Sequence, residues 1–505
     1  MNRRTLLKSA GLLSLAYPFQ RFYGLQTAPR FSANPFAAGV ASGDPTRNGI
    51  VLWTRLIPDP SGTSDWQRGP VNVNWEIATD ERMQNVVRRG SVAATPDLGH
   101  SVHADVTGLN PNRWYWYRFR AGSAESPIGR TKTAPANPTD RIRFAFASCQ
   151  QYQGGYYTAY KAMVQEDIDL VVFLGDYIYE GGGGTGARRL PAGDAKTLEG
   201  YRDRYATYRS DESLREAHRL FPWVITWDDH EVQDNYAADV PKDSQPREDF
   251  LVRRAAAYQA HYEWLPMPKT SMPRGPDAQL YRNLSFGPMA NFIMLDERQY
   301  RSDQPCGDGI KAPCAEFLTE RSMLGQQQER WLDQQLRGSR SQWNILGNPV
   351  RMAAVDQGRG DTESYSMDVW AAYDTARRRI IANLQNSGAR NPVVITGDIH
   401  SNWVCDLKTD YRKEKSPVVA TELIGTSISS GGDGSDSSPN AEAQAAKNPH
   451  VKFFNNQRGY VRCTLTSKSL TADYRVVEKV SVPESPVSTR ASFIIENGKP
   501  ESHRL

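Results

Sequence analysis

The sequence lacks both a strong charge imbalance and a long apolar run. Its formal net charge is only +4 over 505 residues, and no run of Lys and Arg beyond the extreme N-terminus resembles a nucleic-acid footprint. Electrostatics therefore predict no stable nucleic-acid complex. The apolar stretch at residues 10–19 is far shorter than the ~20 residues that cross a bilayer, so we expect no permanent membrane anchor.

Cysteine is also scarce, and the five cysteines are an odd number, so at least one thiol should stay free even in an oxidising compartment. Cys306 and Cys314 enclose a short loop that contains Gly and Pro and could form a local disulfide. Cys405 and Cys463 lie in strand-like segments and could pair at long range. Sequence alone does not fix the connectivity, but these pairings would leave Cys149 unpaired.

The first residues, MNRRTLLKSAGLLSLAYPF, place Arg3 and Arg4 before a short apolar stretch. This arrangement resembles a twin-arginine export signal. It predicts that residues 1–33 are a signal peptide and spacer, that the twin-arginine export machinery is a partner, and that the protein is periplasmic or secreted. The alternative is an amphipathic N-terminal helix that belongs to the fold.

The rest of the chain is too long for one core, and its pattern changes once. Residues 34–134 are strand-like between turn residues, which predicts a small β-sandwich, and the segment LNPNRWYWYRFRAG is similar to the late strands of fibronectin-type modules. After the linker TAPANPTD, apolar strands alternate with helices. This alternation predicts an α/β catalytic domain over residues 135–485, followed by a C-terminal tail at residues 486–505.

Almost every apolar strand of the second part ends in a polar residue. These residues are Cys149, Asp176, Asp228 with Asp229, Asp296, Asn348 and Asp398. Ligands of open α/β sheets bind outside the carboxyl ends of the strands. We therefore expect a binding site where these strand ends meet.

The motif LGDYIYE places Asp176 at a strand end and Tyr179 three residues later. A carboxylate in this position can bridge two hard cations, and a phenolate favours a trivalent cation such as iron(III). The alternative for an isolated motif of this kind is an Asp that caps a helix.

The motif WDDHEVQDNY gathers Asp228, Asp229, His230, Glu231 and Asn235 after another apolar strand. Burying unpaired charges costs several kcal/mol, so the segment is either a solvated loop or a loop that surrounds cations. Its position after a buried strand, and the amide oxygen of Asn235, favour a cation site.

The motif VVITGDIHSNW ends a third strand with Asp398 and His400. Asp398 and His400 are two residues apart at one edge of a sheet. They can therefore offer one carboxylate oxygen and one imidazole nitrogen to the same site. The alternative is a histidine that is hydrogen-bonded in the core.

Five segments, FASCQ, LGDYIYE, WDDHEV, MLDERQYR and VITGDIHSNW, together resemble the PhoD family of alkaline phosphatases, a branch of the calcineurin-like metallophosphoesterases. The resemblance extends over roughly residues 34–480. It implies an α/β fold in which two facing sheets form a metallophosphoesterase sandwich flanked by helices, preceded by a fibronectin-like β-sandwich. It also implies a site that holds one iron(III) and calcium.

Carried onto this sequence, the resemblance implies two ligand sets. Iron(III) would be held by Cys149, Asp176, Tyr179 and His400, with Asp176 as the bridge. Calcium would be held by Asp229, Asn235 and Asp398, with Asp228 as a further candidate. A thiolate beside additional carboxylates fits iron with calcium better than zinc. The alternative for Cys149 is a small buried apolar residue.

For the reaction we expect a hydroxide generated on the metals to attack phosphorus in line. Arg298 and Arg301 are candidates for a phosphate clamp, because a guanidinium matches phosphate geometry. Their alternative is surface ion pairing with Asp296 or Glu297. His230 is a candidate acid for the leaving oxygen, with a structural orienting role as its alternative.

The predicted function is an exported alkaline phosphatase that hydrolyses small phosphate esters, either monoesters alone or diesters as well. One alternative is a phosphodiesterase or a phospholipase D-like esterase. An alternative of another class is a secreted binding protein whose metals are structural.

Overall fold

The computed structural model describes residues 29–58, 65–184, 186–413, 415–437 and 439–505. The predicted signal residues Arg3 and Arg4, and the apolar stretch after them, lie outside these ranges. Within the described ranges, none of the helices combines the length and the apolar character needed to cross a membrane.

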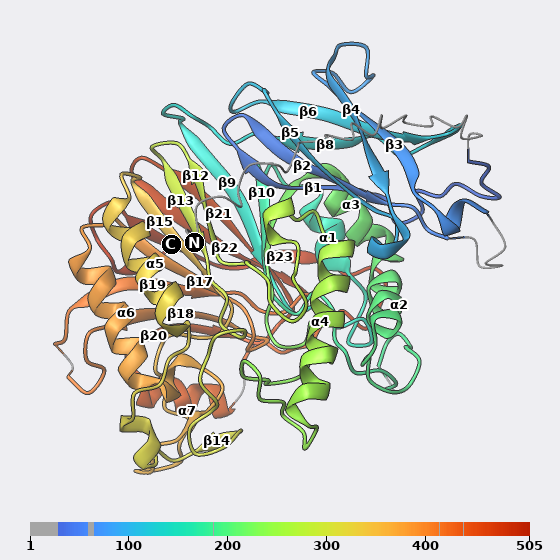
Figure 1. Cartoon of the computed structure of the whole chain (residues 1–505). Helices are drawn as coiled ribbons and strands as arrows, with labels where there is room; N and C mark the ends of the chain where they lie inside the picture. The colour runs from blue at the N-terminus through green and yellow to red at the C-terminus, as the bar shows by residue number, and fades with distance from the viewer. Residues whose placement is uncertain (1–28, 59–64, 185, 414, 438) are drawn as a thin grey trace, which may run out of the picture.

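Two large β-sheets lie at the centre of the molecule and carry helices on their outer sides (Figure 1). The first has ten strands in the order β24-β23-β22-β21-β9-β10-β11-β1-β2-β5. Its strands are β1 (Val40–Thr46), β2 (Gly49–Arg55), β5 (Ser101–Thr107), β9 (Arg141–Ala147), β10 (Leu170–Leu174), β11 (Pro222–Thr226), β21 (Gly459–Thr466), β22 (Ser469–Val477), β23 (Val487–Glu496) and β24 (Ser502–Arg504).

The second sheet has seven strands in the order β12-β13-β15-β17-β19-β18-β20. They are β12 (Arg282–Phe286), β13 (Ala290–Met294), β15 (Trp343–Asn348), β17 (Pro392–Thr396), β18 (Asn402–Lys408), β19 (Val418–Ile424) and β20 (Val451–Asn455). A separate pair joins β14 (Ile310–Lys311) to β16 (Tyr365–Ser366).

The centres of both large sheets are parallel, as the alternation of strands and helices predicted. In the first sheet β9, β10 and β11 run parallel, and in the second β13, β15, β17 and β19 do so. Parallel neighbours need a crossover connection, which is usually a helix. The predicted fold class, two facing sheets flanked by helices, is confirmed.

The helices form the two outer layers. They are α1 (Thr158–Met163), α2 (Leu198–Arg209), α3 (Glu212–Leu220), α4 (Arg247–Trp264), α5 (Gly325–Gly338), α6 (Asp374–Asn386) and α7 (Pro439–Lys447). Helices α1 to α4 pack on the ten-stranded sheet, whereas α5 and α6 pack on the seven-stranded sheet. A third apolar cluster fills the space between the sheets.

Strand β10 shows why the central strands have continuous apolar sequences. Leu170, Val172 and Leu174 contribute to the core between the sheets, while Val171 and Phe173 contribute to the core under the helices. Successive side chains of a strand point to opposite faces. Because both faces are covered, all five residues are buried and no polar alternation remains.

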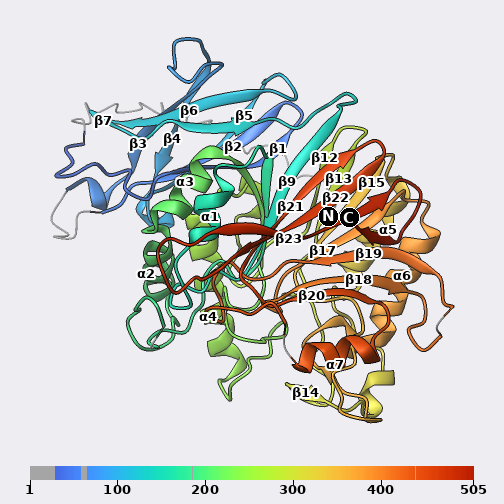
Figure 2. The ribbon, with the colours of Figure 1, turned by 180° about the vertical axis from the view of Figure 1, so that it is seen from behind.

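The predicted N-terminal β-sandwich is present, but one of its sheets is shared. Its outer sheet contains β3 (Val71–Ala78), β4 (Val86–Ala94), β6 (Trp114–Ala121), β7 (Ala124–Glu125) and β8 (Gly129–Lys132). Its other layer consists of β1, β2 and β5, which belong to the ten-stranded sheet. Strand β1 pairs in parallel with β11, so the sandwich continues directly into the central sheet (Figures 1 and 2).

The prediction of a C-terminal tail at residues 486–505 is wrong. Strand β23 pairs with β22 along its length, and β24 pairs with β23, so these residues form the edge of the ten-stranded sheet (Figure 2). Phe493 and Ile495 are buried in the core between the sheets. The stretch ASFIIE therefore alternates between a buried and a partly exposed face, the pattern of an antiparallel strand with one face on the core.

The predicted long-range disulfide between Cys405 and Cys463 is also wrong, since both thiols are free and buried. Cys405 lies in β18 of the seven-stranded sheet and faces the core under α5 and α6. Cys463 lies in β21 of the ten-stranded sheet and faces the core between the sheets. Each sulfur therefore packs as a small apolar group in a different core.

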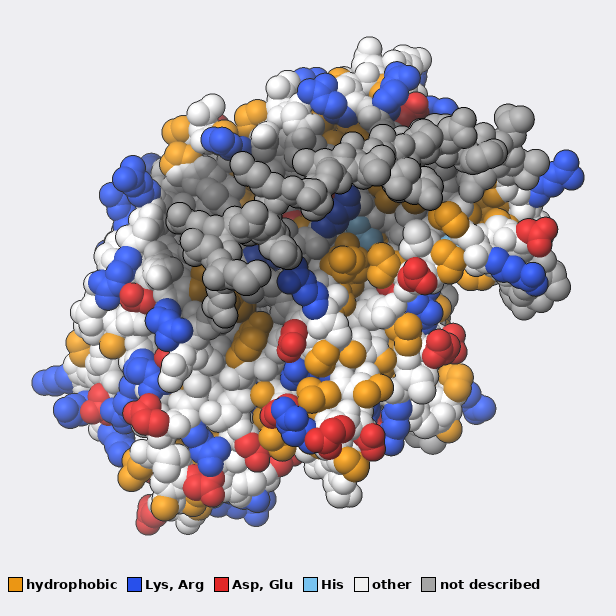
Figure 3. All heavy atoms as spheres, in the orientation of Figure 1, with side chains coloured by type: hydrophobic (Ala, Val, Ile, Leu, Met, Phe, Trp, Pro, Cys, Tyr) orange, Lys and Arg blue, Asp and Glu red, His pale blue; other side chains and the backbone are white. Residues whose placement is uncertain are grey.

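The exposed surface mixes charges of both signs. On the face shown in Figure 3, acidic and basic side chains are interspersed and do not gather into one extended patch of a single sign. This agrees with the small net charge of the sequence.

Candidate metal centre

The predicted strand-end residues meet at one edge of the two sheets. Cys149 follows β9, Asp176 follows β10, Asp229 follows β11, and His400 follows β17. The side chains form two groups of potential metal ligands, and within each group the ligand atoms all lie within 4.8 Å of one another. The first group is Cys149, Asp176 and His400, and the second is Asp176, Asp229 and His230. Asp176 belongs to both groups, which is the position expected of a bridging carboxylate.

The first group is completed by Tyr179. Its phenolic oxygen lies 2.8 Å from Oδ2 of Asp176 and 3.0 Å from Nε2 of His400. The thiol of Cys149 is free and buried. The structure therefore brings together all four residues that the resemblance assigned to iron(III).

The second group has a network of oxygen atoms around it. The backbone N–H of Asn235 donates to Oδ2 of Asp229 at 2.6 Å. Nδ2 of Asn235 donates to both carboxylate oxygens of Asp308, at 2.9 and 3.1 Å. The nitrogen of the side-chain amide is engaged in this way, whereas no hydrogen bond to its side-chain oxygen is recorded among the described residues, so that oxygen remains a candidate ligand for a cation.

Asp228 and Asp398 lie close to these groups but outside them. Burial raises the pKa of Asp228 to about 6, although the Arg298 guanidinium opposes the shift. Burial, and then the charge of Asp228, raise the pKa of Asp398. The two residues add negative charge to the site, but the structure records neither within the two ligand groups.

His230 lies in the second group and is oriented by a carboxylate that the sequence analysis did not assign. Its Nδ1 donates to Oε2 of Glu180 at 2.7 Å, since a carboxylate oxygen can only accept. The other oxygen of Glu180 accepts from the backbone N–H of Asp234 at 2.7 Å. This arrangement fixes the imidazole ring and leaves Nε2 as the nitrogen that can serve a substrate or a cation.

The backbone is strained at the predicted ligands. Five of them have left-handed φ angles: Cys149 at 58°, Asp176 at 56°, Asn235 at 52°, Asp398 at 64° and His400 at 52°. Non-glycine residues adopt this region infrequently, and each instance costs on the order of 1 kcal/mol or more. Such strain persists where the surrounding structure imposes it, and it clusters at functional sites.

The glycine of the LGD motif allows the two acidic loops to approach each other. Gly175 has a φ of 105°, and a Cβ atom at this position would lie 2.5 Å from Cβ of Asp228 and 2.6 Å from its backbone nitrogen. Any side chain would therefore separate the strand end that carries Asp176 from the one that carries Asp228.

The charge distribution fits the binding of cations. Burial raises the pKa of Asp176 and of Cys149, because an unneutralised anion is unfavourable in a dry site. Oδ1 of Asp176 and Oδ2 of Asp228 are buried without a hydrogen-bond partner among the described residues. Burial lowers the pKa of His400 to about 3, so its imidazole is neutral and can act as a ligand. Buried, unpartnered carboxylate oxygens beside a neutral imidazole form a donor set suited to metal ions.

Glu231 joins the two acidic loops from behind, a role that the sequence analysis missed. Its carboxylate accepts from the backbone N–H groups of Asp176 at 3.1 Å, Tyr177 at 2.7 Å and Asp228 at 2.9 Å. It is buried, and burial raises its pKa to about 7. The only sequence signal for this role is its place directly after the DDH residues.

The expected roles of Arg298 and Arg301 need correction, because neither side chain is exposed at the surface. Arg298 pairs with Asp228 and lies 2.8 Å from Oδ2 of Asp368. Arg301 pairs with the other oxygen of Asp368. Both are therefore buried counter-ions behind the acidic residues. Neither the predicted phosphate clamp nor the alternative of surface pairing with Asp296 or Glu297 describes them.

Two other strand-end residues also have structural roles. Asp296 accepts from the backbone N–H groups of Arg298 and Gln299, at 3.1 and 3.0 Å, and so stabilises the turn after β13. Asn348 donates from Nδ2 to Oγ1 of Thr396 at 3.2 Å. A polar residue at a strand end thus lies at the edge of the sheet, but it does not have to belong to the site.

The structure contains a disulfide between Cys306 and Cys314, the local pairing that the sequence suggested. Their Cα atoms are 6.0 Å apart. The closed loop carries Asp308, which contacts Asn235. The disulfide therefore restrains a loop that borders the site.

A cleft of about 340 Å³ opens beside the centre. It is lined by Tyr179, Glu180, His230, Gln151, Gln153 and the glycines at 181–184, 154 and 186. A small molecule in this cleft would lie against the phenol of Tyr179 and the imidazole of His230.

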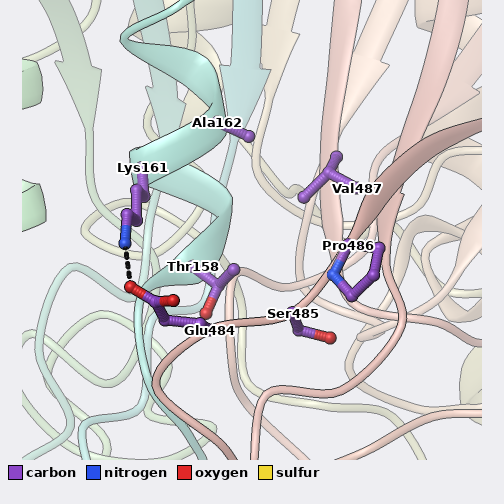
Figure 4. A pocket seen from close by; sticks show the side chains of 7 residues that line it. All are labelled: Thr158, Lys161, Ala162, Glu484, Ser485, Pro486 and Val487. Atoms are coloured by element: carbon purple, nitrogen blue, oxygen red, sulfur yellow. Dashed lines mark hydrogen bonds and ion pairs between the residues drawn. The ribbon is translucent and has the colours of Figure 1, made fainter.

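A second cleft, of about 470 Å³, lies away from the strand ends between α1 and residues 484–487 (Figure 4). Lys161 and Glu484 form an ion pair of 2.5 Å there, and both side chains are largely exposed. The other lining residues are Thr158, Ala162, Ser485, Pro486 and Val487. This lining has no histidine or cysteine and no group of carboxylates, whereas the first cleft borders the potential metal ligands.

The fold and the site define an α/β class of protein in which two facing sheets present two buried groups of potential metal ligands at their strand ends. Comparison with known proteins identifies the family. The model of the PhoD-like phosphatase family matches residues 144–474. The model of the N-terminal domain of PhoD-like phosphatases matches residues 24–135.

Individual relatives agree with the family models. The chain is 46% identical to alkaline phosphatase D of Bacillus subtilis (strain 168) over 510 residues, which cover 98% of this chain and 88% of that protein. A solved structure described as the structure of PhoD superposes with a TM-score of 0.92 at 47% identity, covering 95% of this chain and 93% of that one. The chain belongs to the PhoD-like phosphatase family and is a phosphoric ester hydrolase, as the five motifs predicted.

Proposed function

We propose that the chain is an exported phosphatase whose activity depends on iron(III) and calcium. Cys149, Asp176, Tyr179 and His400 would hold iron(III). Asp229, Asn235 and Asp398 would hold calcium, with Asp176 as the bridge between the two cations. The observation that carries the proposal is the position of Asp176 in both ligand groups. One bridging carboxylate between a soft, anionic ligand set and an oxygen-rich set supports two different cations.

When bound, the cations would supply the nucleophile by acidifying water and would offset the charge on the phosphate oxygens. The protein's own groups complete the site. The carboxylate of Glu180 holds Nδ1 of His230, which directs Nε2 toward the cleft as the candidate donor to the leaving oxygen. The buried guanidinium of Arg298 neutralises part of the carboxylate charge.

The test compares hydrolysis of a chromogenic monoester and a chromogenic diester by the wild type and by Asp176→Asn. Asn keeps the shape of Asp but removes the bridging charge, so we expect turnover to fall at least 1,000-fold and both metals to be lost on elemental analysis. Asp333→Asn, in an exposed ion pair on α5, is the matched control and should leave both unchanged. Full turnover by Asp176→Asn would contradict the proposal.

The ratio of the two rates assigns the substrate class. A monoester preference supports an alkaline phosphatase, and a diester preference supports the phosphodiesterase or phospholipase D-like alternative. Metal-loaded protein that hydrolyses neither ester would favour the alternative of a binding protein with structural metals.

A further inference from the structure

A buried arginine lies behind the first ligand group. Arg458 precedes β21 and is 3% exposed, yet it has no carboxylate within ion-pair distance among the described residues. One terminal nitrogen donates to three oxygen atoms: the backbone oxygen of His400 at 2.6 Å, Oγ of Ser427 at 2.9 Å and the backbone oxygen of Ser430 at 2.7 Å. The guanidinium thus ties the loop after β17 to the loop after β19.

The serine held in this way reaches the metal ligands. Oγ of Ser430 lies 2.8 Å from the phenolic oxygen of Tyr179 and 2.6 Å from the backbone oxygen of Cys149. It also accepts from the backbone N–H of Gln151 at 3.0 Å. Ser430 is fully buried, so its hydroxyl has no water to satisfy it and must use these contacts.

Counting hydrogen atoms shows that these contacts cannot all be satisfied at once. The Ser430 hydroxyl has one proton, and the carbonyl oxygen of Cys149 can only accept it. While Tyr179 keeps its own proton, that proton can go to Asp176, and Ser430 can donate to Cys149. The oxygen of a metal-bound phenolate carries no proton and can only accept, and Oγ of Ser430, 2.8 Å away, is placed to donate to it.

We propose that Ser430 is a positioning residue that donates a hydrogen bond to the phenolate of Tyr179 in the metal-loaded protein, and that Arg458 holds Ser430 in place for this purpose. The inference rests on the proposed function, because it requires Tyr179 to be a metal ligand. Hydrogen bonds to ligand atoms fix the ligand and tune the metal it binds, and removing one typically weakens metal binding by about tenfold or more.

The test compares Ser430→Ala with Ser429→Ala. Ser429 is an equally buried neighbour in the same loop, but its hydroxyl donates to the backbone oxygen of Gln151 at 2.7 Å and is not recorded in contact with Tyr179. Both variants lose one buried serine hydroxyl, but Ser430→Ala also loses the contacts to the phenol of Tyr179 and to the backbones of Cys149 and Gln151. The visible band reports on the phenol contact among these. Two readouts are taken on protein loaded with iron(III) and calcium: the visible absorption band and the rate of iron loss to a competing chelator.

Ser430→Ala should shift the visible band to longer wavelength, because a phenolate without a donated hydrogen bond gives up electron density more easily. It should also lose iron about tenfold faster. Ser429→Ala should match the wild type in both, and Ser430→Thr, which keeps a hydroxyl, should restore the band. Arg458→Lys keeps the charge but not the forked geometry, so it should behave like Ser430→Ala.

Equal bands and equal iron loss in Ser430→Ala and Ser429→Ala would overturn this inference while leaving the proposed function intact. If the wild type is colourless but retains another transition metal, the rate of metal loss decides alone, by the same comparison. A wild type that retains no transition metal would overturn both the metal assignment and this inference.

Discussion

The phenolic oxygen of Tyr179 lies 3.0 Å from Nε2 of His400, although 221 residues separate the two in the chain. Tyr179 follows β10 of the ten-stranded sheet and His400 follows β17 of the seven-stranded sheet. The contact therefore joins the two sheets at the edge where both present their strand ends. A metal held by these two residues would depend on the packing of the sheets.

Replacing Tyr179 by Phe tests the role of the phenol. The ring is retained, so the packing against His230, whose ring centre is 4.1 Å away, should change little. Loss of the oxygen should make the visible band of the iron-loaded protein fade or shift, and both iron affinity and turnover should fall at least tenfold. Absorption spectra and elemental analysis measure the effect. An unchanged band would show that the phenol does not bind the metal.

Replacing Arg298 by Gln tests whether this residue is a counter-ion or a substrate clamp. Its loss leaves Asp228 without its buried partner and leaves Asp368 paired with Arg301 alone, which should lower the free energy of unfolding by roughly 3–5 kcal/mol. Arg337→Gln, in an exposed pair on α5, is the control and should cost less than ~1 kcal/mol. Urea titration measures both. A raised KM with unchanged stability would restore the clamp that the sequence suggested.

Much of the fold could be predicted from the sequence because each central strand is buried on both faces. The apolar run of β10 and the Asp176 that ends it are neighbours in the chain, so one short segment identifies both the strand and its ligand. The same holds for Asp229 after β11 and His400 after β17. The candidate positions therefore follow from local sequence and from the rule that strand ends meet at one edge, whereas their division between two metals was implied by the family resemblance and stays a prediction.

The rest of the site depends on contacts between distant segments. The sequence around Arg298 does not indicate that the residue is buried, because its partner Asp368 is 70 residues away in the chain. Ser430 is 251 residues from Tyr179 and lies in a serine- and glycine-rich segment that resembles an ordinary loop. Likewise, the pairing of β23 with β22 and of β24 with β23 makes the expected tail the last two strands of the ten-stranded sheet. No local pattern specifies these partners.

The buried His103 predicts a loss of stability in acid. Burial lowers its pKa from near 6.5 to about 4, so the unfolded chain binds more protons between these values. Stability contributed by the neutral ring is present above pH 6.5 and is lost as the pH falls toward 4. By pH 5 the loss should be about 2 kcal/mol.

The variant His103→Asn isolates this contribution. Asn keeps a donor for the backbone oxygen of Met267, which Nδ1 of His103 contacts at 2.9 Å, but it cannot titrate. Urea unfolding at pH 7.5 and pH 5 should show a smaller drop for the variant than for the wild type. Equal drops would mean that other groups account for the whole acid sensitivity.

The export prediction is tested by changing Arg3 and Arg4 together to Lys. As a twin-arginine signal, the pair would be an address read by a receptor, so the variant should retain activity in cell extracts but remain in the cytoplasm. Fractionation followed by an activity assay measures this. Normal export of the double variant would contradict a twin-arginine route.

Removal of calcium should affect the two proposed metal sites differently. Asp229 and Asn235 offer carboxylate and amide oxygens, the ligands that calcium prefers, and these groups exchange hard cations readily. The thiol of Cys149 and the phenol of Tyr179 belong to the other site and favour a trivalent transition metal. A calcium-selective chelator should therefore abolish turnover, because the second cation helps to neutralise the phosphate and its leaving group.

The visible band should remain largely in place during this treatment, and added calcium should restore turnover. Magnesium is the matched control: it is smaller, demands near-octahedral geometry and retains its water, so it should restore much less activity at equal concentration. Turnover and absorbance followed in the same sample distinguish the outcomes. An enzyme that survives the chelator with full activity, or that loses its colour with its calcium, would show that these residues do not divide between two different metals.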